Sequence, residues 1–494
     1  MIEAHLPVLV VVVLLLGAIV TVLGGGGRGS WLVALAAVAT SFFLALRLLE
    51  KVVSDGSVRE LLGDWPAPWG IELHVDLLGA IIITLVTGVG LVTTFYSYRS
   101  VRHEIAADRV NLFYSLWLLA ITGMVGICVT GDVFNIYVLL EVSSLAMYSL
   151  VAMGKDRDRR ALPAAFNYLV LGSIAASFIL IGIGYLYMLT GTLNIDDLHQ
   201  RLSQLPQNRT LETAFAFLMV GLSIKVALFP LHLWLPEAYS RAPTAVAALL
   251  SATATKVGIY ITFRFVFSVF GTDTGFLGVS NSTILLTCAA LAIVFGSLSA
   301  ARQKSLSRIL AYSSVAQIGY IVLGLALLEK NAVEGALLHT VFHALMKGGL
   351  FMVAGIYIYR LGSNDLDRLR GIGRKMPWTS AALVAGGLGM IGVPGTAGFI
   401  SKLYLLRGTI ASGEWLLTAA ILLGSIFAAI YVWRVLEIVY LQKATDDREI
   451  KEAPLELLIP TWTLLGLSIA VGLHSSWVVE LLEGAAAAML GGNG

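Results

Sequence analysis

The chain has 494 residues, of which 57% are hydrophobic and 13% are charged, and its formal net charge is +2. A soluble protein of this length could not bury so much apolar surface, so the composition indicates a polytopic membrane protein surrounded by a lipid bilayer. The basic residues form no large cluster, which argues against nucleic acid as a partner.

Fourteen apolar segments are each long enough to cross ~30 Å of hydrocarbon. The first begins with an acidic residue and has no basic n-region, so it is predicted to span the membrane and not to be a cleaved signal. We therefore expect an all-α polytopic membrane protein with spans at roughly 5–24, 31–48, 73–97, 111–129, 131–153, 162–190, 212–230, 243–270, 282–300, 308–328, 332–358, 380–404, 414–440 and 454–472.

Lysine and arginine predict the orientation of these spans. The loops that follow odd-numbered spans hold 20 basic residues, whereas the alternate loops hold 6. The first set is therefore predicted to be cytoplasmic, with both termini on the outer side. The longest connections are 49–72 and 191–211, and a short amphipathic tail follows residue 472.

Seven basic residues fall inside predicted spans. A lysine at a helix centre costs about 2.5–3.5 kcal/mol on the lenient insertion scale, so the four lysines are candidate functional residues. The three arginines lie nearer span ends, where they are predicted to reach the lipid head groups. The seven are Arg47, Lys225, Lys256, Arg264, Lys347, Lys402 and Arg434.

The seventh span ends in "KVALFPLHLWLP", which places Lys225 five residues before Pro230. Proline lacks an N–H and clashes with the carbonyl four residues earlier, so the helix is predicted to break just after Lys225. Unwound backbone at membrane depth needs protein or water around it, which favours a hydrated cavity. The alternative is a kinked helix whose lysine only pairs with a structural carboxylate. His232, near the break, is either a proton-entrance residue or a packing residue.

The twelfth span contains "GVPGTAGFISKLYLL", in which Gly392, Pro394, Gly395 and Gly398 predict a second interruption close to Lys402. Paired interruptions in two halves of a chain are typical of transport sites between inverted repeats. The two broken spans, 7 and 12, are five apart, which predicts inverted five-helix repeats in spans 4–8 and 9–13. The predicted regions are 1–110 for spans 1–3, 111–270 and 282–440 for the repeats, and 441–494 for span 14 and the tail.

Glu141 lies ten residues into its span, near the middle of the membrane. An isolated buried glutamate would take up a proton, but opposite a lysine it can stay ionised, so we predict an ion pair between Glu141 and Lys225. Asp132, at the start of the same span, is predicted to cap the helix. Lys256 follows the small and hydroxyl residues of "SATAT", which suit close packing and hydrogen bonding.

His339, His343 and Lys347 are spaced four and four, so they share one face of a helix. Imidazoles donate and accept hydrogen bonds and titrate near neutral pH, so the stripe is predicted to carry protons. A metal shared by the two histidines is a rival interpretation, but no third ligand lies nearby and Lys347 would repel the ion. A purely structural histidine pair is the other alternative. We expect no metal and no cofactor.

Four segments together resemble a known family. They are "GDVFNIYVLLE", "KVALFPLHLWLPEAYSRAPTAVAALLSATATKVGIY", "HTVFHALMKGGLF" and "GVPGTAGFISKLYLL". They are similar to the proton-translocating subunits shared by Mrp-type cation/proton antiporters, respiratory complex I and membrane-bound hydrogenases, over roughly residues 70–470. The first segment and Lys402 are most similar to the D subunit of Mrp-type multisubunit Na⁺/H⁺ antiporters, and the long C-terminal lateral helix of the largest complex I paralogue is lacking.

The resemblance implies a role for each candidate. Glu141 would tune Lys225, Lys256 would relay protons, the 339–343–347 stripe would continue the path, and Lys402 would end it. It also implies a subunit of a multisubunit antiporter in a prokaryotic cell (inner) membrane, which moves H⁺ against a monovalent cation, expected to be Na⁺, together with other subunits. No redox or hydrolytic centre is expected in the chain itself. The alternatives are a translocating subunit of a complex I-type dehydrogenase or hydrogenase, and a scaffold whose buried charges only hold helices together.

Overall fold

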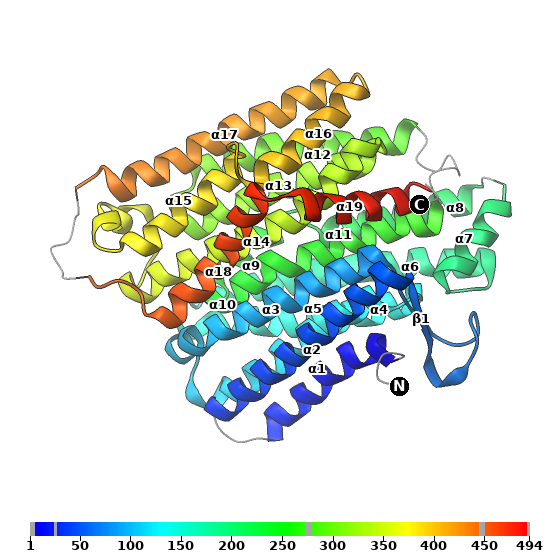
Figure 1. The fold of residues 1–494 in the computed structure, drawn as a ribbon, viewed down its shortest axis with the longest axis horizontal. Helices are drawn as coiled ribbons and strands as arrows, with labels where there is room; N and C mark the ends of the chain where they lie inside the picture. The colour runs from blue at the N-terminus through cyan, green and yellow to red at the C-terminus, as the bar shows by residue number, and fades with distance from the viewer. Residues whose placement is uncertain (1–4, 24–26, 207, 272–278, 444–449, 492–494) are drawn as a thin grey trace.

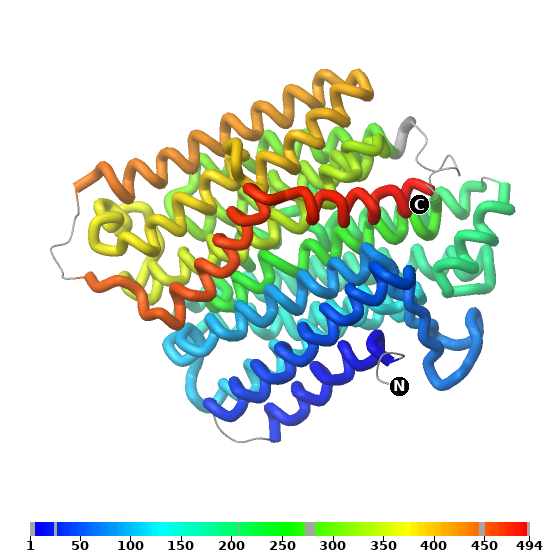
Figure 2. Tube along the Cα trace, viewed as in Figure 1, coloured from blue at the N-terminus to red at the C-terminus, as the bar shows by residue number. Residues whose placement is uncertain are grey.

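The computed structural model describes residues 5–23, 27–206, 208–271, 279–443 and 450–491. Long helices lie side by side in one bundle, with α1 and α17 at opposite edges of the view in Figure 1. The same path of the chain is traced in Figure 2. The end of α1 that starts the chain and the end of α19 lie at the same end of the bundle as the β-hairpin.

The N-terminal region holds three long helices and a small antiparallel hairpin, in which Val58 pairs with Val75 and Leu61 with Glu72. Its elements are α1 (Leu6–Leu23), α2 (Gly27–Asp55), β1 (Val58–Leu61), the 3₁₀ turn η2 (Leu62–Asp64), β2 (Glu72–Val75), α3 (Leu77–Glu104) and the 3₁₀ turn η3 (Ala107–Arg109).

The next region contains the first break and a span with two π-helical stretches. Its elements are α4 (Val110–Val129), α5 (Val133–Ala152), the 3₁₀ turn η4 (Met153–Asp156), α6 (Ala161–Thr190), α7 (Ile195–Gln204), α8 (Arg209–Lys225), α9 (Trp234–Arg241), α10 (Thr244–Leu249), π-helical η5 (Leu250–Ala254), α11 (Thr255–Phe263) and π-helical η6 (Arg264–Phe270).

The last region contains the second break. Its elements are α12 (Val279–Arg302), α13 (Leu306–Leu327), α14 (Lys330–Leu361), the 3₁₀ turns η7 (Leu366–Leu369) and η8 (Ile372–Arg374), α15 (Pro377–Ile391), α16 (Ala397–Ala411), α17 (Trp415–Tyr440), α18 (Leu455–Leu473) and α19 (Ser476–Met489).

Within the described residues, twelve helical segments are long and apolar enough to cross a membrane by length and composition. They coincide with twelve of the fourteen predicted spans, which confirms an all-helical polytopic membrane protein. The seventh and twelfth predicted spans are the two that the chain builds from shorter helices, α8 and the pair α15 and α16. The tail after residue 472 contains the helix α19.

Some boundaries differ from the prediction. The third span was expected to begin at residue 73, but residues 72–75 form β2, and the helix starts at Leu77, where the side chain of Asp76 caps it by accepting from the N–H of Gly79. Asp132 caps α5 in the same way through the N–H of Asn135 at 2.7 Å, as predicted. The 191–211 connection contains α7, and α2 continues to Asp55, well into the 49–72 connection.

The two ends of the bundle differ in charge. At one end, here called the basic end, the loop before α6, the end of α9, the loop between α12 and α13 and the loop after α14 meet around one cavity. These loops all belong to the set that the sequence predicts to be cytoplasmic. The opposite end, the hairpin end, carries β1, β2 and α7. The deepest part of the bundle is formed by α13, α14 and the span from α10 to η6, whose side chains are almost all buried.

A line of buried lysines and histidines between two helix breaks

The first break begins directly after Lys225, as predicted. Ala227 adopts a left-handed backbone with φ of 58°, and the N–H of Leu228 donates to the carbonyl of Ser223 at 2.9 Å. This bond closes the end of α8 in the manner of a Schellman motif. The helix therefore ends before Pro230 is reached, and the proline prevents it from continuing.

The chain resumes as α9, which remains tied to the end of α8. The indole Nε1 of Trp234 donates to the carbonyl of Ile224 at 2.8 Å, across the break. The Trp234 ring also stacks on Tyr168 of α6, with centroids 4.2 Å apart. The unwound segment between Lys225 and Trp234 is thus held at both ends by packed elements.

Lys225 forms the ion pair that the sequence predicts. Its Nζ lies 3.3 Å from Oε1 of Glu141, 3.0 Å from the hydroxyl of Ser144 and 3.4 Å from that of Tyr148, so all three partners lie on one face of α5. The lysine side chain is 8% exposed and the glutamate 23%. The pair therefore has one buried member and one that reaches the protein surface.

Lys256 is fully buried at the start of α11, where the π-helical stretch η5 ends. Its Nζ donates to the carbonyl of Ser251, five residues earlier, and lies 3.3 Å from the hydroxyl of Thr255. Wider π-helical turns occur often at functional positions, because they disturb the regular hydrogen-bond ladder. No carboxylate pairs with Lys256 among the described residues.

The predicted stripe lies on α14 and is fully buried. His339 is held from both sides, by Oε1 of Gln317 at 2.7 Å on Nε2 and by the hydroxyl of Ser401 at 2.8 Å on Nδ1. Since an amide oxygen only accepts, Nε2 donates. The His343 ring stacks on His339 with centroids 5.9 Å apart, and neither of its nitrogens has a hydrogen-bond partner within the described part of the chain.

Lys347 ends the stripe. Its Nζ donates to the carbonyl of Leu310 at 2.7 Å and to the hydroxyl of Ser313, both on α13. Like Lys256, it is bonded to neutral oxygens, with no carboxylate partner in the described ranges.

The second break lies between Ile391 and Ala397, where Gly392 and Gly395 have φ of 85° and 87°. Glycine adopts this left-handed conformation without steric cost. Gly398 was predicted to belong to the interruption but lies inside α16. A Cβ there would meet the Gly389 carbonyl oxygen at 1.9 Å, so its role is to let α16 approach α15 closely.

Lys402 lies beyond this break and points back at it. Its Nζ donates to the carbonyls of Met390 and Ile391, both at 3.0 Å, and to the hydroxyl of Ser425 at 3.1 Å. The last carbonyls of a helix have no partner within it and carry partial negative charge, so they suit a cation. Nζ also lies 4.9 Å from the ring centroid of Tyr320.

These contacts connect only some of the residues of the predicted proton path. Tyr320 lies between Lys402 and His339, with its ring centroid 5.5 Å from the imidazole, and His343 stacks on His339 in turn. No hydrogen bond joins Lys225 to Lys256 in the described residues, although α11 packs directly on the break: a Cβ on Gly258 would lie 3.0 Å from the Val226 side chain.

His232 lies in the first break, but its contacts are with aromatic rings. Its imidazole stacks on Phe229 with centroids 5.4 Å apart, and Phe229 stacks in turn on Phe295 of α12 at the same distance. The side chain is buried, and its Nδ1 has no partner among the described residues. The structure therefore does not bring His232 to Lys225.

Several residues of the site were missed by the sequence analysis. They are neutral polar side chains that hold the charged ones in position. Gln317 and the serine pair in "AYSSVAQIGY" gave the clearest available signal, because polar groups are rare in so apolar a span. The missed residues are Ser144, Tyr148, Ser313, Gln317, Tyr320, Ser401 and Ser425.

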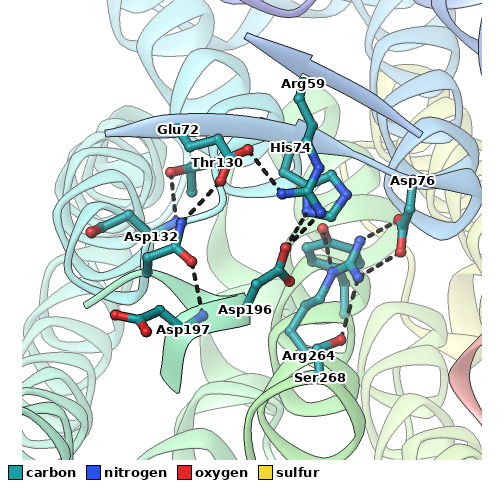
Figure 3. Close-up of polar contacts among 12 residues, drawn as sticks. Arg59, Glu72, His74, Asp76, Thr130, Asp132, Asp196, Asp197, Arg264 and Ser268 are labelled. Carbon is teal, nitrogen blue, oxygen red and sulfur yellow. Dashed lines mark hydrogen bonds and ion pairs between the residues drawn. The ribbon is translucent and has the colours of Figure 1, made fainter. Parts of the chain in front are cut away.

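The prediction that Arg264 reaches the lipid head groups is wrong. Arg264 is buried, and its guanidinium binds both oxygens of Asp76 and the hydroxyl of Tyr260 (Figure 3). Burial raises the pKa of Asp76, but the Arg264 charge and hydrogen bonds, with the N–H of Gly79, hold it below its usual range. The ion pair joins the start of α3 to η6.

Figure 3 also shows Arg59 of β1 between two carboxylates at the hairpin end. It contacts Glu72 of β2 at 3.0 Å and Asp196 of α7 at 2.6 Å, and the amide of Asn194 donates to Glu72 at 3.0 Å. This network holds the hairpin against α7. The network shares no residue with the buried lysines and histidines of the candidate site, so we interpret it as structural.

Comparison with known proteins gives the family. The family described as "NADH:quinone oxidoreductase/Mrp antiporter, TM" matches residues 130–428, more than half of the chain. The N subunit of the NADH-quinone oxidoreductase of Desulforudis audaxviator is 41% identical, with 97% of each chain covered. The D subunit of the Na⁺/H⁺ antiporter of Alkalihalophilus pseudofirmus is 30% identical, with 88% of this chain and 87% of the relative covered.

Among solved structures, the Mrp complex of a Dietzia species contains a chain with a TM-score of 0.91, 24% identity, and coverage of 99% of this chain and 98% of that one. That likeness concerns the fold. The higher identity to the oxidoreductase relative does not favour the Mrp branch that the sequence motifs suggested. The chain belongs to the NADH:quinone oxidoreductase/Mrp antiporter transmembrane family, the antiporter-like membrane subunits of such multisubunit complexes.

Proposed function

We propose that this chain conducts protons as an antiporter-like subunit of a redox-driven membrane complex of the NADH:quinone type. The observation that carries the proposal is the ion pair between Lys225 and Glu141 at a helix break, at one end of a set of buried lysines and histidines that ends at Lys402. The 41% identity to an NADH-quinone oxidoreductase subunit over almost the whole chain supports the choice of complex.

The proton step begins at the first break. While Glu141 stays within 3.3 Å, its carboxylate stabilises the ammonium of Lys225. When Glu141 moves away, the ammonium remains as an unpaired charge at membrane depth, and releasing its proton becomes favourable. Because Glu141 is partly exposed, a charge on a neighbouring subunit can draw it away.

The released proton then passes toward the second break. We propose Lys256, His343 and His339 as its carriers, since each can accept and then pass on a proton. Lys402 receives it beside the carbonyls that end α15, to which its Nζ donates, and delivers it toward the other surface. The neutral partners Gln317 and Ser401 hold the His339 ring so that its two nitrogens face opposite neighbours.

A second candidate is a subunit of an Mrp-type antiporter, in which the same proton path would be coupled to Na⁺ or another monovalent cation. The 30% identity to the D subunit of a Na⁺/H⁺ antiporter favours it. The lysine in the second broken helix, Lys402, was the sequence feature that suggested this branch. The two candidates share the chemistry of this chain and differ in what drives it.

The distribution of basic residues in the loops supports a proposal for the orientation in the membrane. The basic end is proposed to face the cytoplasm of a prokaryotic cell, and the hairpin end, with both termini, the outside. The two breaks are proposed to belong to inverted five-helix units, spans 4–8 and 9–13. The two broken spans are five apart, an odd number, so the two units would cross the membrane in opposite directions.

The test is to purify the tagged chain with its native partners and reconstitute the complex in vesicles containing a pH-sensitive dye. We expect co-purified redox subunits and proton movement that starts when an electron donor and a quinone are supplied. Proton movement that instead requires a Na⁺ gradient, in a complex without redox subunits, would replace the first candidate with the second. Absence of proton movement under both driving forces would contradict both.

A further inference from the structure

The cavity at the basic end has a volume of about 620 Å³ and a strongly positive lining. Its walls come from the loop between α5 and α6, the end of α9, the loop between α12 and α13, and the loop after α14. Two aspartates, Asp158 and Asp365, oppose six basic side chains: Arg157, Arg160, Arg241, Arg302, Lys304 and Arg308.

Half of these positive charges are already neutralised within the fold. Arg157 pairs with Glu104 at 2.7 Å, Arg241 with Asp158 at 2.6 Å, and Arg308 with Glu237 at 2.8 Å. The other three are Arg160, Arg302 and Lys304, which are exposed and form no ion pair within the described part of the chain.

One of the neutralised residues also has an unpaired donor. Arg308 lines the cavity, and its Nε is buried without a hydrogen-bond partner among the described residues. Even with Asp365 in its lining, a cavity with three cations that form no ion pair in the described residues suits a phosphate group, which arginine recognises through paired charge-assisted hydrogen bonds.

An apolar surface adjoins this cavity on the membrane side. Arg302 is the last residue of α12, and Phe295, seven residues earlier, lies about 10 Å further into the membrane. Phe295 is 45% exposed and stacks on Phe229 of the first break. In the same break Leu233 is 71% exposed, only one residue before the start of α9, which leads down to the cavity at Arg241.

We propose that the basic cavity binds the phosphate headgroup of an anionic phospholipid, whose acyl chains lie over Phe295 and Leu233 beside the first break. Basic pockets between membrane helices at the cytoplasmic surface suit such headgroups. The apolar surface decides between sources of phosphate, because a free phosphate ion or an acidic protein loop would gain nothing from it. A lipid bound here would lie against the segment that begins after Lys225, which gives membrane composition a direct contact with the proposed proton site.

The test uses the full chain in phosphatidylcholine nanodiscs that contain a minor fraction of phosphatidylglycerol, with retained lipid measured by native mass spectrometry. The variant Arg302→Gln/Lys304→Gln removes two charges that have no ion-pair partner in the described fold, so folding is not at stake. We expect its apparent affinity for phosphatidylglycerol to fall roughly 30-fold. The control Arg368→Gln/Arg374→Gln removes the same charge from exposed residues at the same end, outside the cavity, and should retain the lipid.

Three results would overturn the proposal. Equal loss of phosphatidylglycerol in both double variants, or in neither, would mean that the cavity is no specific lipid site. Displacement of the lipid by millimolar inorganic phosphate would assign the cavity to a free anion. Retention of the lipid by the cavity variant, together with loss of a neighbouring subunit from the purified native complex, would assign it to an acidic protein segment.

Discussion

The two helix breaks place a lysine in opposite chemical situations. Lys225 is the last residue before its break, and its charged partner is the side chain of Glu141, which is partly exposed on another helix. Lys402 follows its break, and its partners are two backbone carbonyls and a serine hydroxyl. A side-chain carboxylate can swing away or change its charge, whereas carbonyls at a helix end can do neither. We therefore propose that the first break is switched during transport and that the second stays constant.

Removing the carboxylate partner of Lys225 is expected to slow transport strongly. In Glu141→Gln, Lys225 keeps only the neutral Ser144 and Tyr148, and loss of one partner of a buried ion pair costs about 3–5 kcal/mol. We expect proton flux in vesicles containing the intact complex to fall by on the order of 100-fold. Glu212→Gln, an exposed glutamate on α8 itself, is the matched control and should leave the flux unchanged. Normal flux in Glu141→Gln would mean that the ion pair is only structural.

A smaller loss is expected at the second break. Lys402→Glu places a carboxylate beside the carbonyls of Met390 and Ile391. Repulsion between these oxygens should move the new side chain away from the proposed proton path. Flux should fall about 10-fold, which corresponds to roughly 1.4 kcal/mol. The exposed Arg407 on the same helix offers the control, since Arg407→Glu makes the same charge change. A neutral result for Lys402→Glu would make Lys402 a structural residue.

Between the two breaks, a change at Gln317 tests whether transport depends on the orientation of the His339 ring. Gln317→Leu removes the acceptor of His339 Nε2, and an unsatisfied buried donor costs about 1–3 kcal/mol. We expect a several-fold slower flux in an assembled complex, measured by the same vesicle assay. Gln200→Leu, at an exposed position on α7, should be silent. An unchanged rate in Gln317→Leu would show that the orientation of the His339 ring does not limit transport.

The smallest effect on flux is expected at Asp76, because its ion pair with Arg264 adjoins neither break. Asp76→Asn should instead reduce stability, toward the lower end of the ~3–5 kcal/mol range for breaking a buried pair, since the Asp76 side chain is 32% exposed. Thermal unfolding in detergent measures it against Glu50→Gln, which breaks an exposed pair worth about 1 kcal/mol or less. A strong flux defect at unchanged stability would place Asp76 in the proton path.

The charged residues of the site could be predicted from the sequence, because a charge inside a membrane span costs free energy and is rarely found there without a function. Lys225, Glu141 and Lys402 stand out in apolar runs, and the breaks beside two of them follow from Pro230 and from a glycine-rich stretch. The contact between Lys225 and Glu141 could be proposed because each would be unstable alone. The roles of these residues and the inverted repeats stay predictions.

What escaped prediction gave a weak signal or depended on distant residues. Ser401 and Ser425 cost little within a helix, so nothing in the sequence separates them from packing residues, and the signal from Gln317 is a single polar residue in an apolar span. The partner of Arg264 lies 188 positions away, and a residue near a span end is usually expected to reach the head groups. The strands of the hairpin have four residues each, too short for an alternating pattern to be recognised beside tryptophans and prolines.

The central claim is that a titratable amine at the first break carries the transported proton. The most direct measurement is proton uptake by vesicles that contain the purified native complex with Lys225→Ala, compared with wild type at equal subunit content. We predict that the complex assembles with all its subunits and that uptake falls to the level of empty vesicles. Undiminished uptake in a fully assembled Lys225→Ala complex would contradict the claim.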